Sequence, residues 1–421
     1  MKITGKKVII IGGARSGMAA AKLLLARGAK VDISDNRDDA LIRKDLEGLG
    51  KIGAGIELGG HTPDFVRGHQ IAILSPGVSS QAPVISWLKS AGIRMISEIE
   101  LAYSLFQGEI IAVTGTNGKT TVTALIGKML NDAGRKAVVC GNIGNPFSNE
   151  VIRQTNGLIA VVEISSFQLE WIKDFRPHLS LILNVTDDHL DRYRNFDHYL
   201  QTKLKISINQ KEGDFCLINS GEPYSKKIFK KTRAKILYFD NQNGNFDLNQ
   251  QAVMLAGSLY GLSKNSMLKT LNEFKPFSHR MEYINTVNGI KFINDSKATN
   301  VGAVKWALER ISEPVILIAG GRNKKNDFKK LRPWVKNKVR QAVLVGEARA
   351  KLKNALDGVI PFKETFTFTD AFKLAYSIAK PGEVVLLSPA CTSFDMFSNF
   401  EERGEAFRDL VARCKEQGQD F

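Results

Sequence analysis

The sequence has few cysteines and no long apolar run, and each lack excludes a class of protein. The cysteines among its 421 residues are widely spaced and form no C-x-x-C pair: Cys140, Cys216, Cys391 and Cys414. Neither a disulfide framework nor a zinc site is indicated, which favours a reducing compartment. No stretch approaches the roughly 18 to 20 apolar residues of a membrane span, and the apolar run 8–11 is too short for a signal-peptide core. We therefore expect a cytoplasmic chain without membrane insertion.

Positive charge is in excess. The formal net charge is +16, which attracts nucleic acid and phosphorylated small molecules alike. The basic residues are spread along the chain, and neither a basic stripe interleaved with aromatic residues nor a helix-turn-helix pattern accompanies them. We expect no nucleic-acid partner, and a nucleic-acid-stimulated ATPase stays open as an alternative on charge alone.

Residues 109–134 carry the pattern of a phosphate-binding loop. The run 110–113 predicts a buried strand and 122–130 has the apolar spacing of a helix, with Gly-Thr-Asn-Gly-Lys-Thr at 115–120 between them. In such a loop backbone N–H groups and the helix dipole face one anion, the lysine reaches the β- and γ-phosphates, and a hydroxyl ligates Mg²⁺. Val113 stands where the usual spacing has glycine, so an ordinary strand-to-helix turn is the alternative. We predict a nucleoside triphosphate as ligand.

A second glycine-rich turn lies near the N-terminus. The apolar strand 7–11 leads into Gly-Gly-Ala-Arg-Ser-Gly at 12–17, and a helix and a second strand follow, ending in Asp35. This order resembles a dinucleotide-binding βαβ unit with alanine at the middle glycine. A later strand ends in Ser75-Pro76-Gly77, whose backbone could face the same ligand. The pattern predicts a nucleotide-sized ligand and does not identify NAD.

Carboxylates follow two strands of the middle segment. The apolar run 158–162 ends in Glu163, which is well placed to hold a nucleotide-bound Mg²⁺. An acid interacting with a helix dipole is the alternative for Glu163. The strand 179–184 opens into an Asp-Asp-His run at 187–189, an unusual density of polar ligands for a passive loop. Residues 203–208 predict a helix.

The last third of the chain continues the alternation of strands and helices. Strands are predicted at 291–294, 315–319, 342–345 and 384–387. Polar or glycine-bearing loops follow these strands and include Asp295, Gly320 and Ser388. This describes an α/β protein with open sheets, whose ligand crevice lies along one sheet edge.

Together these loops resemble the Mur ligases, ATP-dependent enzymes that extend the peptide of the bacterial cell-wall precursor. The stretches 114–120 and 163–168 match those shared across the family, whereas 294–300, 388–395 and 399–404 resemble its D-glutamate-adding members. The chain lacks the Asp-Asn-Pro-Arg motif of the diaminopimelate- or lysine-adding ligases and the Gly-Ala-His-Asn type motif of folylpolyglutamate synthases. The resemblance extends over nearly the whole chain.

The resemblance implies an α/β fold of three domains. Residues 1–107 would form a Rossmann-like domain that binds UDP, and 108–276 a central P-loop ATPase-like domain with a mostly parallel sheet. Residues 277–421 would form a Rossmann-like domain that binds D-glutamate and closes on ATP. The implied protein is a cytoplasmic monomer of peptidoglycan precursor synthesis, and so of cell-wall biogenesis, cell shape and cell division. Its ligands are UDP-N-acetylmuramoyl-L-alanine, D-glutamate, ATP and two Mg²⁺ ions.

Site residues follow from the same resemblance, position by position. The ATP set is Gly115, Thr116, Asn117, Gly118, Lys119, Thr120, Thr121, Asn249, Arg280 and Asp295. The UDP-substrate set is Ser16, Asp35, Asn36, Arg37, Ser75, Gly77, Asn142 and His189. The D-glutamate set is Thr299, Lys324, Ser393 and Phe400. The metal ligands are Thr120, Glu163, His189 and, once carbamylated, Lys203. The catalytic set is Lys119, His189, Lys203 and Lys297.

The chemistry of the side chains restricts two of these assignments, those of Lys203 and His189. An unmodified ammonium cannot ligate a metal, so Lys203 requires carbamylation, and chemistry alone does not choose Lys203 over Lys205. We interpret His189 as a ligand or substrate contact and not as the general base.

The implied reaction is activation of the L-alanine carboxylate by phosphoryl transfer from ATP, followed by attack of the D-glutamate amine. A non-catalytic sugar-nucleotide sensor on the same fold is the alternative. The sequence departs from the family at Phe246, where the family has asparagine, in a shorter connection before Asn249, and at Asn323, where aspartate is common. Lys325 and Asn326 replace small residues. None of these positions belongs to the phosphate loop or the metal ligands, so we expect activity to survive.

Overall fold

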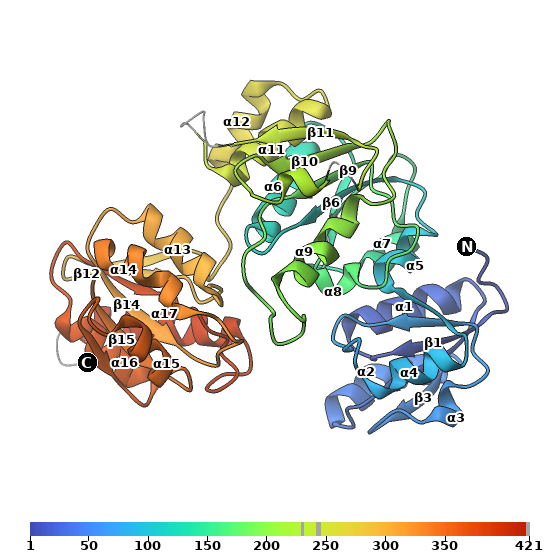
Figure 1. Cartoon of the computed structure of the whole chain (residues 1–421), viewed down its shortest axis with the longest axis horizontal. Coiled ribbons are helices and arrows are strands. Elements are labelled where there is room, and N and C mark those ends of the chain that lie inside the picture. Colours follow the sequence, from blue (N-terminus) through green and yellow to red (C-terminus); the bar gives the residue numbers. More distant parts are fainter. Residues whose placement is uncertain (229–230, 241–245, 418–421) are drawn as a thin grey trace. The chain divides into compact units, whose positions relative to one another are not determined.

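The computed structural model describes residues 1–228, 231–240 and 246–417. The connection before Asn249 lies partly outside the described residues. The chain forms two compact units, one of residues 1–185 with 197–274 and the other of 186–196 with 275–421 (Figure 1). None of the helices in the described part of the chain combines the length and the hydropathy that a membrane crossing requires.

The first sheet of the first unit is parallel throughout, in the order β3-β2-β1-β4-β5. Its strands are β1 (Lys7–Ile11), β2 (Lys30–Asp35), β3 (Gly55–Leu58), β4 (Ile71–Leu74) and β5 (Arg94–Ser97). The helices are α1 (Arg15–Ala26), α2 (Ala40–Lys51), α3 (Pro63–Val66), α4 (Pro83–Ser90) and α5 (Glu98–Tyr103). The predicted glycine turn joins β1 to α1, and a Cβ on Gly17 would come within 2.0 Å of the Gly12 carbonyl oxygen. Only glycine permits this close approach of helix and turn.

The second sheet of the first unit is also entirely parallel, in the order β11-β10-β9-β6-β8-β7. Its strands are β6 (Glu109–Thr114), β7 (Ala137–Gly141), β8 (Ile159–Glu163), β9 (Leu179–Ile182), β10 (Phe215–Asn219) and β11 (Lys235–Phe239). The helices are α6 (Lys119–Asp132), α7 (Phe147–Arg153), α8 (Ser166–Leu169), α9 (Phe196–Leu204), α10 (Ser225–Ile228), α11 (Leu248–Leu259) and α12 (Lys264–Glu273), with a 3₁₀ turn at Lys205–Ser207.

The prediction of a helix at 203–208 placed its start at the wrong residue. Lys203 lies in the last turn of α9, which begins at Phe196, and only one 3₁₀ turn follows it. The apolar spacing was weak because the buried residues of α9 include the polar Thr202 and Lys203.

Two buried acids on α5 join the two sheets of the first unit. The Glu100 carboxylate accepts hydrogen bonds from the backbone N–H groups of Lys173, Asp174 and Phe175, each at 2.9 Å. Glu98 accepts one from the N–H of Ser148 at 2.6 Å. Carboxylates buried in this way are stabilised by backbone donors and hold the first sheet against the second.

The second unit contains a mixed sheet in the order β12-β13-β17-β14-β15-β16, in which only the pair β12–β13 is antiparallel. Its strands are β12 (Glu282–Val287), β13 (Ile290–Asn294), β14 (Val315–Gly320), β15 (Val339–Val345), β16 (Phe362–Glu364) and β17 (Val384–Leu387). The helices are α13 (Val301–Arg310), α14 (Arg332–Lys338), α15 (Arg349–Leu356), α16 (Phe368–Ile378) and α17 (Phe400–Gln417), with a 3₁₀ turn at Phe328–Leu331.

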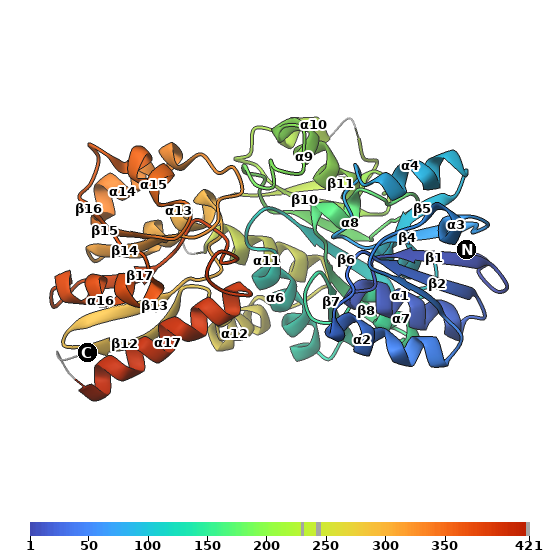
Figure 2. The same cartoon turned by 90° about the horizontal axis from the view of Figure 1, so that it is seen from below.

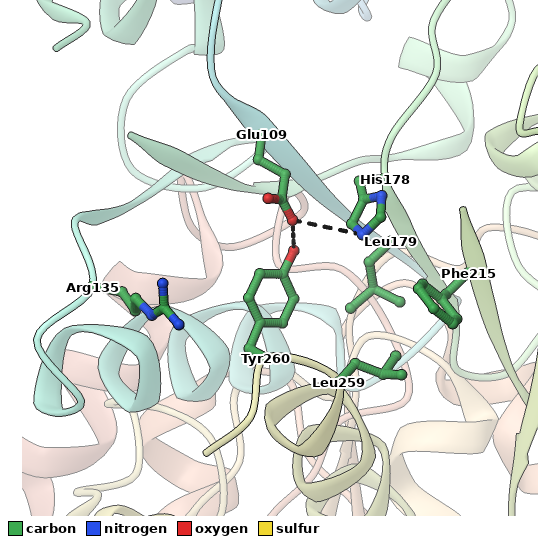
Figure 3. A pocket seen from close by; sticks show the side chains of 7 residues that line it. All are labelled: Glu109, Arg135, His178, Leu179, Phe215, Leu259 and Tyr260. Atoms are coloured by element: carbon green, nitrogen blue, oxygen red, sulfur yellow. Dashed lines mark hydrogen bonds and ion pairs between the residues drawn. The ribbon is translucent and has the colours of Figure 1, made fainter. Parts of the chain in front are cut away.

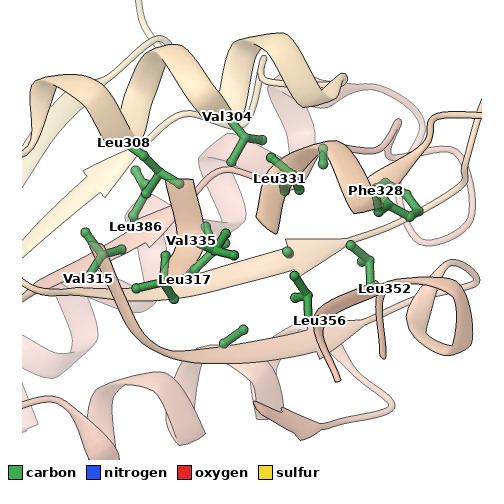
Figure 4. Packing of buried hydrophobic residues seen from close by; sticks show 14 of the residues in the cluster. Val304, Leu308, Val315, Leu317, Phe328, Leu331, Val335, Leu352, Leu356 and Leu386 are labelled. Carbon is green, nitrogen blue, oxygen red and sulfur yellow. The ribbon is translucent and has the colours of Figure 1, made fainter. Parts of the chain in front are cut away.

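Helices cover both faces of this sheet (Figure 2). Leu317 of β14 packs with Leu308 of α13 and Leu352 of α15 on one face (Figure 4). Its neighbour Ile318 packs on the other face with the cluster that includes Phe372 of α16. Successive residues of a strand point to opposite faces, so a strand buried on both faces reads as the continuous apolar run seen in the sequence. The predicted α/β fold class, with open and mostly parallel sheets, is confirmed.

Candidate active site

The predicted phosphate loop connects β6 to α6. Gly118 caps the helix N-terminus with φ +83°, and Gly115 has φ +157°. A Cβ on Gly118 would lie 2.5 Å from the side-chain oxygen of Asn249, at the start of α11. Asn249 therefore lies against the loop, and the residue at 118 must be glycine both for its backbone conformation and for this contact.

Asn184, two residues after the end of β9, holds the loop from the other side. Its side-chain oxygen accepts the N–H of Asn117 at 2.9 Å and its amide donates to the Asn117 carbonyl at 3.0 Å. Its own carbonyl accepts the N–H of Thr116 at 2.8 Å. Asn184 had no predicted role, although its place just after an apolar strand was the available signal.

Two lysines meet at the first residue of the loop. The Nζ atoms of Lys119 and Lys203 donate to the carbonyl of Gly115 at 2.9 and 2.8 Å, and Lys119 also donates to the Thr116 carbonyl. Lys203 is 1% exposed and its Nζ lies 4.8 Å from the ring centre of Tyr199. The Tyr199 hydroxyl is 3.2 Å from Oγ1 of Thr116, a contact that was not predicted because Tyr199 stands in no glycine or acidic motif.

Lys205 is directed elsewhere. Its Nζ donates to the carbonyl of Glu170 at 3.1 Å, and burial lowers its pKa. The structure thus distinguishes the two lysines that residue chemistry left equivalent, because only Lys203 reaches the phosphate loop.

Glu163 ends β8 as predicted and is 1% exposed. Its Oε1 accepts a hydrogen bond from Nδ2 of Asn142 at 2.7 Å. Its Oε2 is buried and has no hydrogen-bond partner among the described residues. A buried carboxylate oxygen without a partner is costly unless something binds it, and a hard cation suits such an oxygen.

A complete metal site does not follow from protein side chains alone. Within residues 1–228, 231–240 and 246–417, no three His, Cys, Asp or Glu side chains form a group that could hold a metal ion. His189 belongs to the second unit, where its φ is +55° and its N–H donates to Oδ1 of Asp188 at 2.9 Å. Nδ2 of Asn300 donates to the same carboxylate at 3.2 Å. Phosphate oxygens and water would have to supply the remaining donors to a cation at Glu163.

In the first sheet, the predicted UDP residues gather at the ends of β1, β2 and β4. Oδ2 of Asp35 accepts the N–H of Gly13 at 2.6 Å, and Oδ1 accepts the N–H and Nε of Arg37 at 2.9 and 3.3 Å. Burial opposes ionisation of Asp35, but these hydrogen bonds outweigh it and lower the pKa of the carboxyl. Oγ of Ser75 donates to the Gly12 carbonyl at 2.7 Å. Among the other predicted UDP residues of this sheet, Asn36 and Gly77 lie on these loops and Ser16 lies in the first turn of α1, and all three are partly or fully exposed.

In the second unit, Asp295 follows β13 and is almost fully buried. Its carboxylate accepts hydrogen bonds from Oγ of Ser388 at 2.9 Å and from the N–H of Met281 at 3.2 Å. Burial raises the pKa of Asp295 to about 7 in spite of these bonds. Arg280, assigned to the same nucleotide, is the neighbour of Met281 and partly offsets this rise by its charge.

Lys297, predicted to be catalytic, and Phe400, predicted to bind D-glutamate, lie together. Nζ of Lys297 is 3.5 Å from the centre of the Phe400 ring, a cation–π contact. The buried guanidinium of Arg403 lies on the helix that begins at Phe400, and its Nη2 donates to the carbonyls of Ser296 and Cys391 at 2.7 and 3.1 Å. Oγ of Ser296, the neighbour of Lys297, donates to the carbonyl of Phe400 at 2.8 Å. Arg403 had no predicted role. Its burial was not predicted because the sequence of α17 is rich in charged residues, which usually lie at the surface.

The remaining D-glutamate residues, Thr299, Lys324 and Ser393, lie on loops after three neighbouring strands. Asn326, one of the departures from the family pattern, links these loops because its Nδ2 donates to the carbonyls of Ala390 at 2.9 Å and Thr299 at 3.4 Å. Oδ1 of Asn323, another departure, accepts the N–H of Asn326 at 2.8 Å. The two asparagines therefore act as a pair that holds the loop carrying Lys324.

Family models match most of the chain. Residues 6–97 match the N-terminal domain described as Mur ligase MurD-like, 113–276 the Mur ligase middle domain, and 279–391 the Mur ligase glutamate ligase domain. The UDP-N-acetylmuramoylalanine–D-glutamate ligase of Pelotomaculum thermopropionicum is 36% identical over 98% of this chain and 98% of that protein. The ligase of the same name from Geotalea uraniireducens is 37% identical, again over 98% of both chains.

Solved structures share the fold. The UDP-N-acetylmuramate–alanine ligase of Thermotoga maritima superposes with a TM-score of 0.62 at 18% identity, over 97% of this chain and 100% of that one. The MurF ligase of the same organism, in complex with ADP, superposes with a TM-score of 0.61 at 15% identity, over 98% and 96%. At these identities the likeness concerns the arrangement of the backbone.

Proposed function

This chain belongs to the Mur ligase family, and from that premise we propose that it joins D-glutamate to UDP-N-acetylmuramoyl-L-alanine at the expense of ATP. The observation that carries the proposal is the 36 to 37% identity to D-glutamate ligases over 98% of both chains. The phosphate loop and the unpartnered oxygen of Glu163 support the use of ATP independently.

The chemistry requires an activated acid. A carboxylate does not react with an amine at neutral pH because its oxide is a poor leaving group. Transfer of the γ-phosphoryl group of ATP to the L-alanine carboxylate forms an acyl phosphate and releases ADP. The D-glutamate amine then attacks the acyl carbon, loses a proton and expels phosphate. We assign to Lys119 the neutralisation of charge on the ATP phosphates. We assign to Lys297 the stabilisation of the oxyanion that forms in the second step.

Magnesium is the cation we assign to Glu163. Its ligands would be Thr120, Glu163, His189 and the carbamylated form of Lys203, shared between two ions, with phosphate and water oxygens as the remaining donors. When bound, Mg²⁺ neutralises negative charge on the phosphoryl oxygens. Asn142 would orient the Glu163 carboxylate through the hydrogen bond to its other oxygen.

The other assignments also stand as proposals. Arg280, Asp295 and Asn249 would hold the nucleoside of ATP, and Thr299, Lys324, Ser393 and Phe400 would hold D-glutamate. The loops with Ser16, Asp35 and Ser75 would hold UDP. We keep the domain boundaries at 107/108 and 276/277 and the closing of the third domain on ATP as predictions. We also propose that the chain works as a monomer in the cytoplasm, where ATP is available.

An assay of ADP release tests the function. The full chain is given UDP-N-acetylmuramoyl-L-alanine, ATP and Mg²⁺ with D-glutamate, L-glutamate, L-lysine or diaminopimelate. We expect release with D-glutamate and a rate close to background with the others. Release that is independent of the amino acid contradicts the ligase, release with another amino acid contradicts the substrate, and no release under any condition favours the sugar-nucleotide sensor.

A further inference from the structure

The central sheet carries a second polar cluster at the edge opposite the phosphate loop. Parallel strands β10, β9 and β6 are neighbours, and their amino ends present Asp214, His178 and Glu109 in that order. Nδ1 of His178 is 3.4 Å from Oδ1 of Asp214, and its Nε2 is 3.9 Å from Oε1 of Glu109. None of these side chains has a part in the proposed reaction, because they precede the strands whose carboxyl ends lead into the phosphate loop and Asn184.

Cavities lie on both sides of this row. One of about 420 Å³ is lined by Tyr103, Arg176 and Asp214 among others. Its guanidinium is paired, since Nε and Nη2 of Arg176 donate to the two oxygens of Asp214 at 2.6 and 3.1 Å. Glu109 and His178 line this cavity as well, but Arg176 is already bound to Asp214 and offers little to a ligand carboxylate.

The other cavity, of about 230 Å³, shares Glu109 and His178 with the first and differs in its guanidinium, which is that of Arg135 (Figure 3). The Tyr260 hydroxyl donates to Oε1 of Glu109, the same oxygen that faces His178. Both contacts fall on Oε1, and Oε2 of Glu109 makes no hydrogen bond or ion pair within the described part of the chain. Burial and the neighbouring Glu109 raise the pKa of Tyr260, which keeps its proton and remains a donor.

Arg135 supplies the positive charge. It lies between α6 and β7 and lines the same cavity. No hydrogen bond or ion pair of its guanidinium is found among residues 1–228, 231–240 and 246–417. Figure 3 shows its side chain and that of Glu109 both turned toward Tyr260. The remaining lining is apolar and comes from Leu179, Phe215 and Leu259.

We propose that this cavity is a second small-molecule site, which binds a zwitterion of the α-amino acid class with an apolar side chain. The ammonium group lies at Glu109, the carboxylate at Arg135 and the side chain against the leucines and Phe215. The volume is below the roughly 300 to 1,000 Å³ of drug-sized sites, which suits a ligand the size of one amino acid. A charged ligand pairs Arg135 and the second oxygen of Glu109, which the protein leaves without partners.

The test measures binding to the full chain without nucleotide, by isothermal titration calorimetry. L-leucine carries both charges and an apolar tail, 3-methylbutylamine lacks the carboxylate, and 4-methylpentanoate lacks the ammonium. We expect saturable binding of L-leucine and binding at least about fivefold weaker for each of the other two, the effect of losing one ionic contact at a partly exposed site. No saturable binding of L-leucine, or equal binding of the amine or the acid, overturns the proposal.

Matched variants locate the site. Arg135→Met and Glu109→Gln should each weaken L-leucine binding about fivefold or more. The control variants Arg153→Met and Glu212→Gln alter exposed residues of the same unit and should leave L-leucine binding unchanged. Arg135 is exposed, so its variant tests the site even if Glu109→Gln fails to fold. Unchanged binding in Arg135→Met, or displacement of L-leucine by D-glutamate, assigns the binding to another site and overturns the proposal.

Discussion

Lys119 and Lys203 donate their side-chain ammonium groups to one oxygen, the carbonyl of Gly115. Two positive charges this close repel each other, and the repulsion is strong where Lys203 is excluded from water. The Lys203 ammonium first loses a proton, and the resulting amine reacts with CO₂ to form a carbamate anion with release of a second proton, which replaces one of these positive charges by a negative one. The geometry thus gives a physical reason for the modification that the family resemblance implies.

Loss of Lys203 should abolish turnover, and loss of Lys205 should not. We expect Lys203→Ala to lower kcat by at least about 100-fold and Lys205→Met to change it by less than about threefold. CO₂-free buffer should slow the wild-type protein, and bicarbonate should restore it. ADP release measures all three effects. Equal losses in the two variants would contradict the assignment.

Lys119→Met tests the phosphate loop itself. Removing a preorganised charge from the phosphates should lower kcat by about 100- to 1,000-fold. Lys128→Met is the matched control, because Lys128 lies on the same helix but pairs with Asp132 at the surface. Both variants should unfold at nearly the wild-type temperature. Full turnover in Lys119→Met would refute the proposed mechanism.

Glu163→Gln should change the response to magnesium. The amide keeps the shape of the carboxylate but loses the charge that favours a divalent cation. We expect the Mg²⁺ concentration for half-maximal ADP release to rise about 10-fold or more, with little change for the exposed control Glu212→Gln. A Mg²⁺ dependence that is the same in Glu163→Gln and the wild type would remove Glu163 from the metal ligands.

Asp295 predicts a pH dependence of stability in the ligand-free protein. Its pKa is about 7 when folded against an ordinary value of 3.8, so the native state holds this proton more tightly than the unfolded chain. The contribution of Asp295 to the free energy of unfolding therefore falls as pH rises from about 4 to about 7, and is constant above that. Relative to wild type, Asp295→Asn should gain on the order of 1 to 4 kcal/mol across this window. Chemical denaturation at several pH values measures it, and a pH-independent difference would contradict the prediction.

Replacement of Lys324 should weaken the binding of D-glutamate and leave the binding of ATP unchanged. Lys324→Met removes a charge that we assign to a substrate carboxylate, and should raise the KM for D-glutamate about 10-fold or more while the KM for ATP stays unchanged. The neighbouring Lys325→Met, which alters a more exposed side chain, is the control. A parallel rise in both KM values would indicate a general distortion of the loop.

Local features of the chain were predictable because their causes are local. The strand, glycine turn and helix around Lys119 follow from apolar spacing and from the conformations that glycine alone adopts freely. The carboxylate at the end of β8 was found for the same reason, since Glu163 directly follows an apolar run. The antiparallel strand β12 gave no such signal, because pairing direction depends on where the chain returns and not on the residues of the strand.

The sequence by itself determined the α/β fold class, the phosphate loop and the residues that end the buried strands. Only the tertiary structure decided that Lys203, and not Lys205, reaches Gly115, that Asn249 covers Gly118, and that Arg403 ties Ser296 to Cys391. These choices depend on contacts between residues far apart in the chain. Such contacts arise when whole helices and strands pack on one another, and spacing along the sequence does not encode them.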